Sequence, residues 1–171
     1  PQSNIYLWLW SFIFSLKMIV CSWNINSVRM RENLLLELIN SLNPDVVFLQ
    51  EIKCQNNEFP IIYKEKNYNL VIKGEKGKYG VAILIKKKIE FEEINFESAI
   101  FQSEARICGI KIKNNFNLHL INIYAPNGNP IESKEKFSYK IKWYSELHKF
   151  IKKLINSKVN IILAGDFNVL E

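Results

Sequence analysis

Three short apolar runs that each end on a carboxylate or an amide constrain the fold of this chain more than any other feature. They are Met18–Asn24, Val46–Glu51 and Ile161–Asn168. Short runs rich in β-branched residues and bounded by turn signals are typical of fully buried strands. Polar residues at the ends of such strands lie at the edge of a sheet, where open α/β architectures bind their ligands. The pattern therefore predicts an α/β fold with one polar site assembled from distant segments.

The order of the expected elements predicts mixed sheets. A helical repeat from Leu34 to Leu42 joins the first two runs, with Asn26-Ser27 as a candidate cap and Asn43-Pro44 as its end. This βαβ unit predicts a parallel pair with a right-handed crossover. Polar turns then separate candidate strands that predict antiparallel meanders, at 69–72, 80–85, 89–94, 106–112 and 117–124. A long amphipathic helix over 133–156 leads into a final strand at 160–166.

Composition narrows the class of protein. The chain has 171 residues, enough for one domain with a core, and its 48% hydrophobic content excludes a disordered chain. Its 23 Lys and Arg residues against 17 Asp and Glu residues give a net charge of +6, which favours polyanionic partners. A generally lysine-rich composition explains the same charge without any such partner. Three cysteines without metal spacing predict free thiols in a reducing, cytoplasmic compartment.

The first residues form a separate apolar segment. Ile5–Leu16 is strongly apolar, but it is shorter than the roughly 18 residues expected of a membrane span. It also lacks the basic region and the cleavage site of a signal peptide. Since the chain begins with Pro1 and Met18 opens the first strand, we interpret residues 1–17 as a leader outside the fold and 18–171 as the domain. A signal or an interfacial anchor is the alternative, and no membrane association is expected for the domain itself.

Five motifs in chain order resemble one known family. They are Ser22-Trp-Asn-Ile-Asn-Ser-Val-Arg29, Leu49-Gln-Glu-Ile-Lys53, Gly77-Lys-Tyr-Gly-Val-Ala82, Asn122-Ile-Tyr-Ala-Pro-Asn-Gly128 and Gly165-Asp-Phe-Asn168. Each motif is weak alone, but in this order they resemble the exodeoxyribonuclease III family of apurinic/apyrimidinic endonucleases, within the endonuclease/exonuclease/phosphatase superfamily. The resemblance runs from Met18 to Glu171 and is closer to the bacterial repair enzymes than to the sphingomyelinase or inositol-phosphatase branches.

The first three candidate residues concern a metal. Magnesium (Mg²⁺) prefers hard oxygen ligands, usually one or two carboxylates, and Glu51 ends a buried strand. The resemblance assigns the family's metal-binding glutamate to Glu51 and places Asn24 and Asn26 beside the metal, with Mn²⁺ as a possible substitute. The alternative for a glutamate at a strand end is a helix cap or a surface carboxylate.

The resemblance also implies three catalytic residues. Asp166 orients or deprotonates the attacking water, Asn168 donates a hydrogen bond to the scissile phosphate, and Tyr124 contacts the phosphate or the transition state. The alternative for Gly165–Asn168 alone is an ordinary turn, because Gly and Asn tolerate unusual dihedral angles. The alternative for Tyr124 is an aromatic residue at the end of a strand.

Contacts to the DNA backbone are implied for Lys78, Tyr79, Arg106 and Asn127. For the charged members of this set, a solvated surface is the alternative. We also expect Lys53 to steady the acidic cluster. His119 and His148 match no catalytic position of the family.

The resemblance implies a four-layer α/β/β/α sandwich of two mixed sheets, in about 250 residues or more. In the family, the catalytic histidine and two further acids follow the Gly-Asp-x-Asn strand, so the chain is expected to be truncated before the second half is complete. The implied activity is Mg²⁺-dependent hydrolysis of DNA at abasic sites, with 3′-5′ exodeoxyribonuclease action on duplex DNA, by a monomer when complete. We expect the fragment to be inactive and to leave the sheet face of Val81, Ile83, Ile85, Leu118 and Leu120 uncovered. The alternatives are a non-catalytic DNA-binding fragment and a phosphoesterase of the superfamily with a non-DNA substrate.

Overall fold

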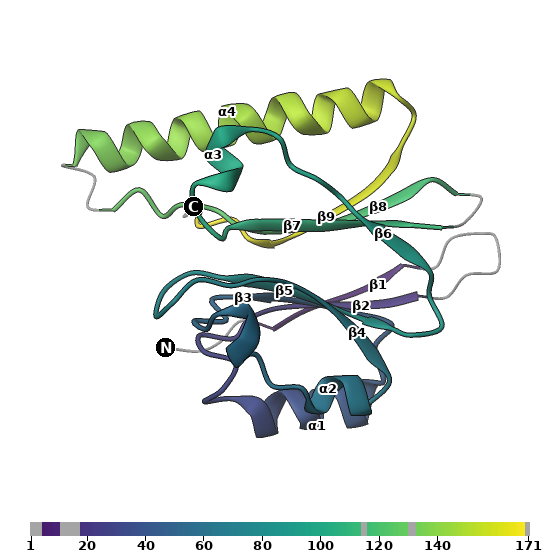
Figure 1. The fold of residues 1–171 in the computed structure, drawn as a ribbon. Coiled ribbons are helices and arrows are strands. Elements are labelled where there is room, and N and C mark those ends of the chain that lie inside the picture. The colour runs from purple at the N-terminus through teal and green to yellow at the C-terminus, as the bar shows by residue number, and fades with distance from the viewer. Residues whose placement is uncertain (1–4, 11–17, 114–115, 130–132, 170–171) are drawn as a thin grey trace.

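The chain folds into four layers, two central sheets with helices on both outer faces (Figure 1). The computed structural model describes residues 5–10, 18–113, 116–129 and 133–169. In the described part, α1 and α2 cover one sheet and α3 and α4 cover the other. The expected α/β/β/α sandwich of two mixed sheets is therefore confirmed.

The first sheet has the strand order β1-β2-β3-β5-β4. Its strands are β1 (Ile5–Trp10), β2 (Met18–Asn24), β3 (Val46–Gln50), β4 (Tyr68–Lys73) and β5 (Val81–Lys86). Strands β2 and β3 are parallel and are joined by α1 (Glu32–Leu42), which confirms the βαβ unit. The pairs β3–β5 and β4–β5 are antiparallel, and the short helices η1 (Asn56–Glu58) and α2 (Ile62–Glu65) precede β4.

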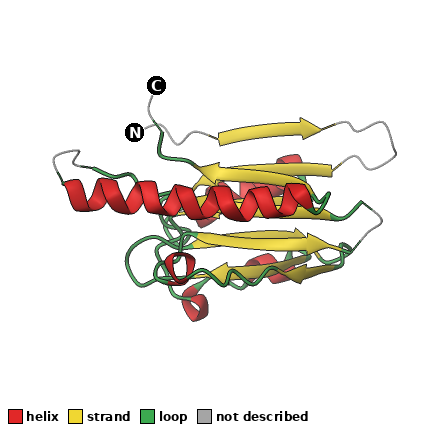
Figure 2. Ribbon diagram, turned by 90° about the horizontal axis from the view of Figure 1, so that it is seen from above, coloured by secondary structure: helices red, strands yellow, loops and turns green. Residues whose placement is uncertain are grey.

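The second sheet has the order β6-β7-β8-β9. Its elements are β6 (Phe91–Glu93), α3 (Ala99–Gln102), β7 (Ile107–Ile112), β8 (Leu118–Tyr124), α4 (Lys134–Asn156) and β9 (Asn160–Asp166). The first two pairings are antiparallel, whereas β8 and β9 are parallel and α4 connects them. Seen from above, α4 lies along the strands of the sheet beneath it (Figure 2).

Three expectations differ from the structure. Residues 5–10 form β1 and pair antiparallel with β2, so this part of the expected leader lies in the sheet, because β2 offers an open hydrogen-bonding edge. Helix α1 begins after Arg31, and Asn26-Ser27 does not cap it because both residues belong to a loop with positive φ. Val81, Ile83, Ile85 and Leu120 are fully buried between the sheets, so the expectation of an uncovered face was wrong.

A polar network crosses this apolar interface between the sheets. Asn122 of β8 donates from Nδ2 to the backbone oxygens of Leu49 and Ala82, each at 2.9 Å, and it accepts at Oδ1 from Gln50 Nε2 at 2.7 Å. Gln50 also donates to Ser22 Oγ at 3.2 Å. Because buried polar groups must be paired, this network fixes how the two sheets face each other.

Among the residues that the structure describes, no helix combines the length and the apolar character needed to cross a membrane.

Candidate active site at the shared end of the two sheets

The carboxyl ends of four strands, two from each sheet, meet at one end of the sandwich. Strands β2 and β3 run parallel in the first sheet, and β8 and β9 run parallel in the second. Strands β2 and β3 pack close to β9, and β3 also packs against β8. The residues at these ends are Asn24, Glu51, Tyr124 and Asp166, so the predicted assembly of one polar cluster from distant segments is found.

Asn24 connects the two carboxylates of the cluster. Its Nδ2 donates to Glu51 Oε1 at 3.0 Å and to Asp166 Oδ2 at 2.8 Å. The hydroxyl of Tyr124 donates to the same Glu51 Oε1 at 3.0 Å. Lys53 Nζ lies 2.9 Å from Glu51 Oε2, as expected for a residue that steadies the acid, and it donates to Asn26 Oδ1 at 2.5 Å.

These partners control the ionisation of Glu51. Burial would raise the pKa of this carboxyl, but hydrogen bonds from Asn24, Lys53 and Tyr124 and the charge of Lys53 outweigh burial and hold the pKa below its usual value. Burial and the neighbouring Glu51 charge together raise the pKa of Tyr124 above its usual value. At neutral pH the site therefore holds an anionic Glu51 and a protonated, donating Tyr124.

Unusual backbone conformations concentrate in the loops around this cluster. Asn26, Glu51, Lys53, Tyr79 and Asn168 all have φ between 45° and 52°. Such conformations cost energy for residues other than glycine and persist where the surroundings enforce them. Here the backbone N–H of Ser27 donates to Glu51 O at 2.7 Å, and that of Ile52 donates to Gly80 O at 3.1 Å. These bonds connect the loops after β2 and β3 with the loop before β5.

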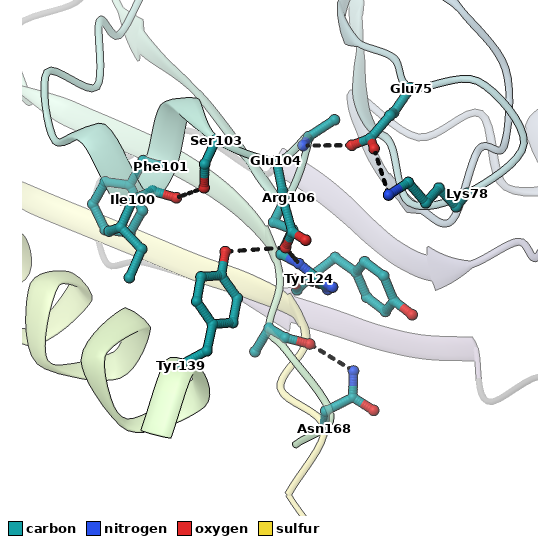
Figure 3. Close-up of polar contacts among 12 residues, drawn as sticks. Glu75, Lys78, Ile100, Phe101, Ser103, Glu104, Arg106, Tyr124, Tyr139 and Asn168 are labelled. Atoms are coloured by element: carbon teal, nitrogen blue, oxygen red, sulfur yellow. Dashed lines mark hydrogen bonds and ion pairs between the residues drawn. The ribbon is translucent and has the colours of Figure 1, made fainter. Parts of the chain in front are cut away.

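The Gly165–Asn168 segment is both a turn and part of the site. Gly165 has φ 141°, and a Cβ there would stand 2.0 Å from Ile123 O, so only glycine allows β9 to approach β8 this closely. Asp166 Oδ1 accepts from the Asn168 N–H at 2.9 Å. The side chain of Asn168 donates from Nδ2 to Ala125 O at 2.7 Å, the dashed line drawn at Asn168 in Figure 3. The turn fixes Asp166 so that its second oxygen, Oδ2, faces Asn24.

The donor set suits a hard divalent cation. Among the described residues, no group of three His, Cys, Asp or Glu side chains is placed to hold a metal. Magnesium needs no such group, because one or two carboxylates, water and a substrate phosphate complete its shell. Glu51 supplies one such carboxylate, with the amides of Asn24 and Asn26 close by, which fits this requirement. Asn24 donates from Nδ2 to both acids, and Asn26 accepts at Oδ1 from Lys53.

The four candidate DNA contacts occupy different environments. Lys78 and Asn127 are exposed, and Lys78 Nζ lies 3.3 Å from Glu75 Oε1. Tyr79 is half-buried, with its ring centroid 6.2 Å from that of Tyr124. Arg106 is buried, with 6% of its surface exposed, and it pairs with Glu104. The burial of Arg106 argues against the solvated-surface alternative for this residue, and its contact with DNA stays a prediction.

The two histidines lie away from the cluster. His119 is on β8, five residues before Tyr124, which places it about 17 Å along the strand. His148 is on α4. In the described part of the chain, no hydrogen bond joins either one to Glu51, Tyr124 or Asp166.

Sequence reasoning missed the supporting role of α4. Lys140 Nζ donates to Asn168 O at 2.8 Å and to Asn127 O at 3.2 Å, and Tyr144 donates to Phe167 O. Tyr139 donates to Glu104 Oε2 at 3.0 Å. The amphipathic pattern of 133–156 predicts the helix but does not reveal that these side chains reach the loops of the site.

Two packed mixed sheets with a carboxylate, amide and tyrosine cluster at their shared end define an α/β sandwich with a candidate phosphoesterase site. Residues 21–170 match the Endonuclease/Exonuclease/phosphatase family. The chain belongs to this family.

Relatives and solved structures agree with this assignment. The chain is 33% identical over 150 residues to an exodeoxyribonuclease III of Haemophilus influenzae, covering 86% of this chain and 56% of that protein. A solved AP endonuclease from Archaeoglobus fulgidus superposes with a TM-score of 0.77 at 31% identity, covering 88% of this chain and 57% of that one. A 3′ phosphatase, NExo, from Neisseria, bound to a product DNA hairpin, superposes with the same TM-score at 25% identity and covers the same shares. The chain thus spans a little over half the length of these proteins.

Proposed function

We propose that this chain is part of a DNA repair nuclease that hydrolyses phosphodiester bonds at abasic sites with Mg²⁺ and also acts as a 3′-5′ exodeoxyribonuclease. The observation that carries the proposal is the cluster in which Asn24 links Glu51 to Asp166 while Tyr124 donates to Glu51. The similarity to an exodeoxyribonuclease III and to an AP endonuclease supports the same chemistry. We further propose a cytoplasmic protein that is monomeric when complete.

Each residue of the site has a separate role in the proposed hydrolysis. A bound Mg²⁺, held by Glu51 with Asn24 and Asn26 beside it, would neutralise charge on the phosphate and stabilise the leaving oxygen. Asp166 orients the attacking water and accepts its proton at the carboxylate, which the Asn168 N–H and Asn24 hold in place. Tyr124 and Asn168 place their donor groups beside the scissile phosphate. This requires the Tyr124 hydroxyl to leave Glu51 Oε1, and Asn168 Nδ2 to leave Ala125 O, when DNA binds.

We propose that residues 1–171 alone are catalytically inactive. General acid catalysis of the leaving group needs a positioned proton donor, and neither His119 nor His148 is near the cluster. We propose that this donor lies outside residues 1–171. A non-catalytic DNA-binding role is then the second candidate, and a non-DNA phosphoester substrate is the third.

Binding of the chain to a duplex with an abasic site should weaken steeply with salt, because lysine and arginine contacts to phosphate release counterions. The basis is the net charge of +6 and the exposed Lys78 at the rim of the cluster. The slope of log K against log salt is about −0.9 per phosphate contact, so Lys78→Met should reduce its magnitude by about 1. Fluorescence anisotropy at fixed pH measures both.

The matched control is Lys152→Met, which removes the same charge near the far end of α4 and should leave the slope unchanged. A slope near zero for the wild type would exclude a DNA partner. Equal binding of an inositol phosphate and the duplex would favour the third candidate.

A further inference from the structure

An ion pair between the buried Arg106 and the partly buried Glu104 lies beside Tyr124. The guanidinium of Arg106 stacks on two aromatic rings, 3.9 Å from the centroid of Tyr79 and 5.0 Å from that of Tyr124. Its Nη1 donates to Tyr124 O at 3.3 Å, and its Nε pairs with Glu104 Oε2. Burial would lower the pKa of Arg106, but the hydrogen bond and charge of Glu104 outweigh burial and raise it, so the pair stays ionised.

The pair is also anchored on its other side. Glu104 Oε2 accepts from the hydroxyl of Tyr139 on α4 at 3.0 Å (Figure 3). The neighbouring Ala105 N–H donates to Glu75 Oε2 at 3.2 Å, and Gly80 N–H donates to Ala105 O at 3.0 Å. Residues 104–106 are therefore tied both to α4 and to the loop that presents Lys78 and Tyr79.

We propose that Arg106 is a positioning residue that holds Tyr124 on Glu51, and not a phosphate ligand. The contacts run without a break from α4 through Tyr139, Glu104 and Arg106 to the ring of Tyr124, whose hydroxyl donates to Glu51. Only 6% of the surface of Arg106 is exposed, and its Nε already donates to Glu104. Little of its guanidinium is therefore accessible to the phosphates of a DNA strand.

The geometry explains why an arginine occupies this position. A guanidinium is planar, so it stacks on aromatic faces while its edge donates to a carboxylate; the ammonium of lysine cannot do both. A buried charge is tolerated only when it is paired, and Glu104 supplies that pairing. The same arrangement places Tyr79, whose φ of 51° is itself strained, against the other face of the guanidinium.

The first test needs no activity. With the tyrosine ring carbons labelled with 13C, the Cζ resonance of Tyr124 is assigned by its loss in Tyr124→Phe among the 7 tyrosines. Arg106→Met should shift or broaden this resonance, and Tyr139→Phe, which removes one hydroxyl, should shift it in the same direction by less. Lys78→Met, the control that keeps the buried pair, should leave it in place. An unchanged Tyr124 resonance in a folded Arg106→Met protein would overturn the proposal.

The second test separates positioning from phosphate contact, and it rests on the proposed function. The salt slope of DNA binding should be the same for Arg106→Met and the wild type, whereas a phosphate ligand would lower its magnitude by about 1. In the complete protein that contains this chain, single-turnover incision by Arg106→Met and by Arg106→Lys should fall about 10–100-fold at unchanged DNA affinity. If neither protein binds or cuts DNA, the proposed function fails while the resonance test still decides the role of Arg106.

Discussion

Replacing Asp166 with Asn is expected to slow single-turnover incision of an abasic duplex by about 10²–10⁴-fold in the complete protein that contains this chain, the range that positioned acid–base groups contribute. The amide keeps the size of the side chain and the turn made with the Asn168 N–H at 2.9 Å, but it cannot accept a proton from water. DNA affinity should change little, because Asp166 is not a cation that contacts phosphate.

The control for this substitution is Glu92→Gln on β6, which makes the same chemical change at an exposed ion pair with Lys113. This variant should cut at the wild-type rate. Normal incision by Asp166→Asn would show that the base lies elsewhere in the protein.

Replacing Asn122 with Leu is expected to lower the free energy of unfolding by about 3–5 kcal/mol, out of a total that is typically about 5–15 kcal/mol. Asn122 is fully buried, and its loss removes the side-chain partner of the oxygens of Leu49 and Ala82 and leaves the Gln50 amide with Ser22 alone. Each orphaned buried group costs about 1–3 kcal/mol. Urea unfolding followed by circular dichroism measures the change.

The control is Ser22→Ala, which removes only the acceptor of the longer Gln50 hydrogen bond, at 3.2 Å. We expect it to cost at most about 1.5 kcal/mol, because Gln50 keeps Asn122 as its partner. A loss below about 1 kcal/mol in Asn122→Leu would show that the network is not what fixes the two sheets together.

The local sequence pattern predicted the two long helices and most strands, but not β1, α2 or α3. The run Met18–Asn24 became β2 without a change of bounds, and Ser133 precedes α4 as its N-cap, accepting from the Lys136 N–H. The pattern of polar residues at strand ends predicted that Glu51 and Asp166 share one site. They follow strands of different sheets, however, so the packing of the two sheets brings them together.

Features that depend on the packing of distant segments were not predicted. Arg106 could not be recognised as buried, since its burial results from Tyr79, Tyr124 and Glu104 closing around it. The pairing of β1 depends on an edge of β2 that the sequence does not show to be open. Likewise, Asn122 lies in one of the five motifs, but the sequence does not show which residues of the other sheet face it.

We propose that Glu51 and its neighbours form a divalent-cation site. Titration of the chain with a divalent cation tests this proposal most directly. Mn²⁺ binding followed by electron paramagnetic resonance, with Mg²⁺ as competitor, should show one saturable site in the wild type and in Glu92→Gln. In Glu51→Gln the affinity should fall about 10-fold or more, because the amide removes the anionic ligand while keeping acceptors for Asn24 and Tyr124. Equal affinity in Glu51→Gln and the wild type would contradict the account.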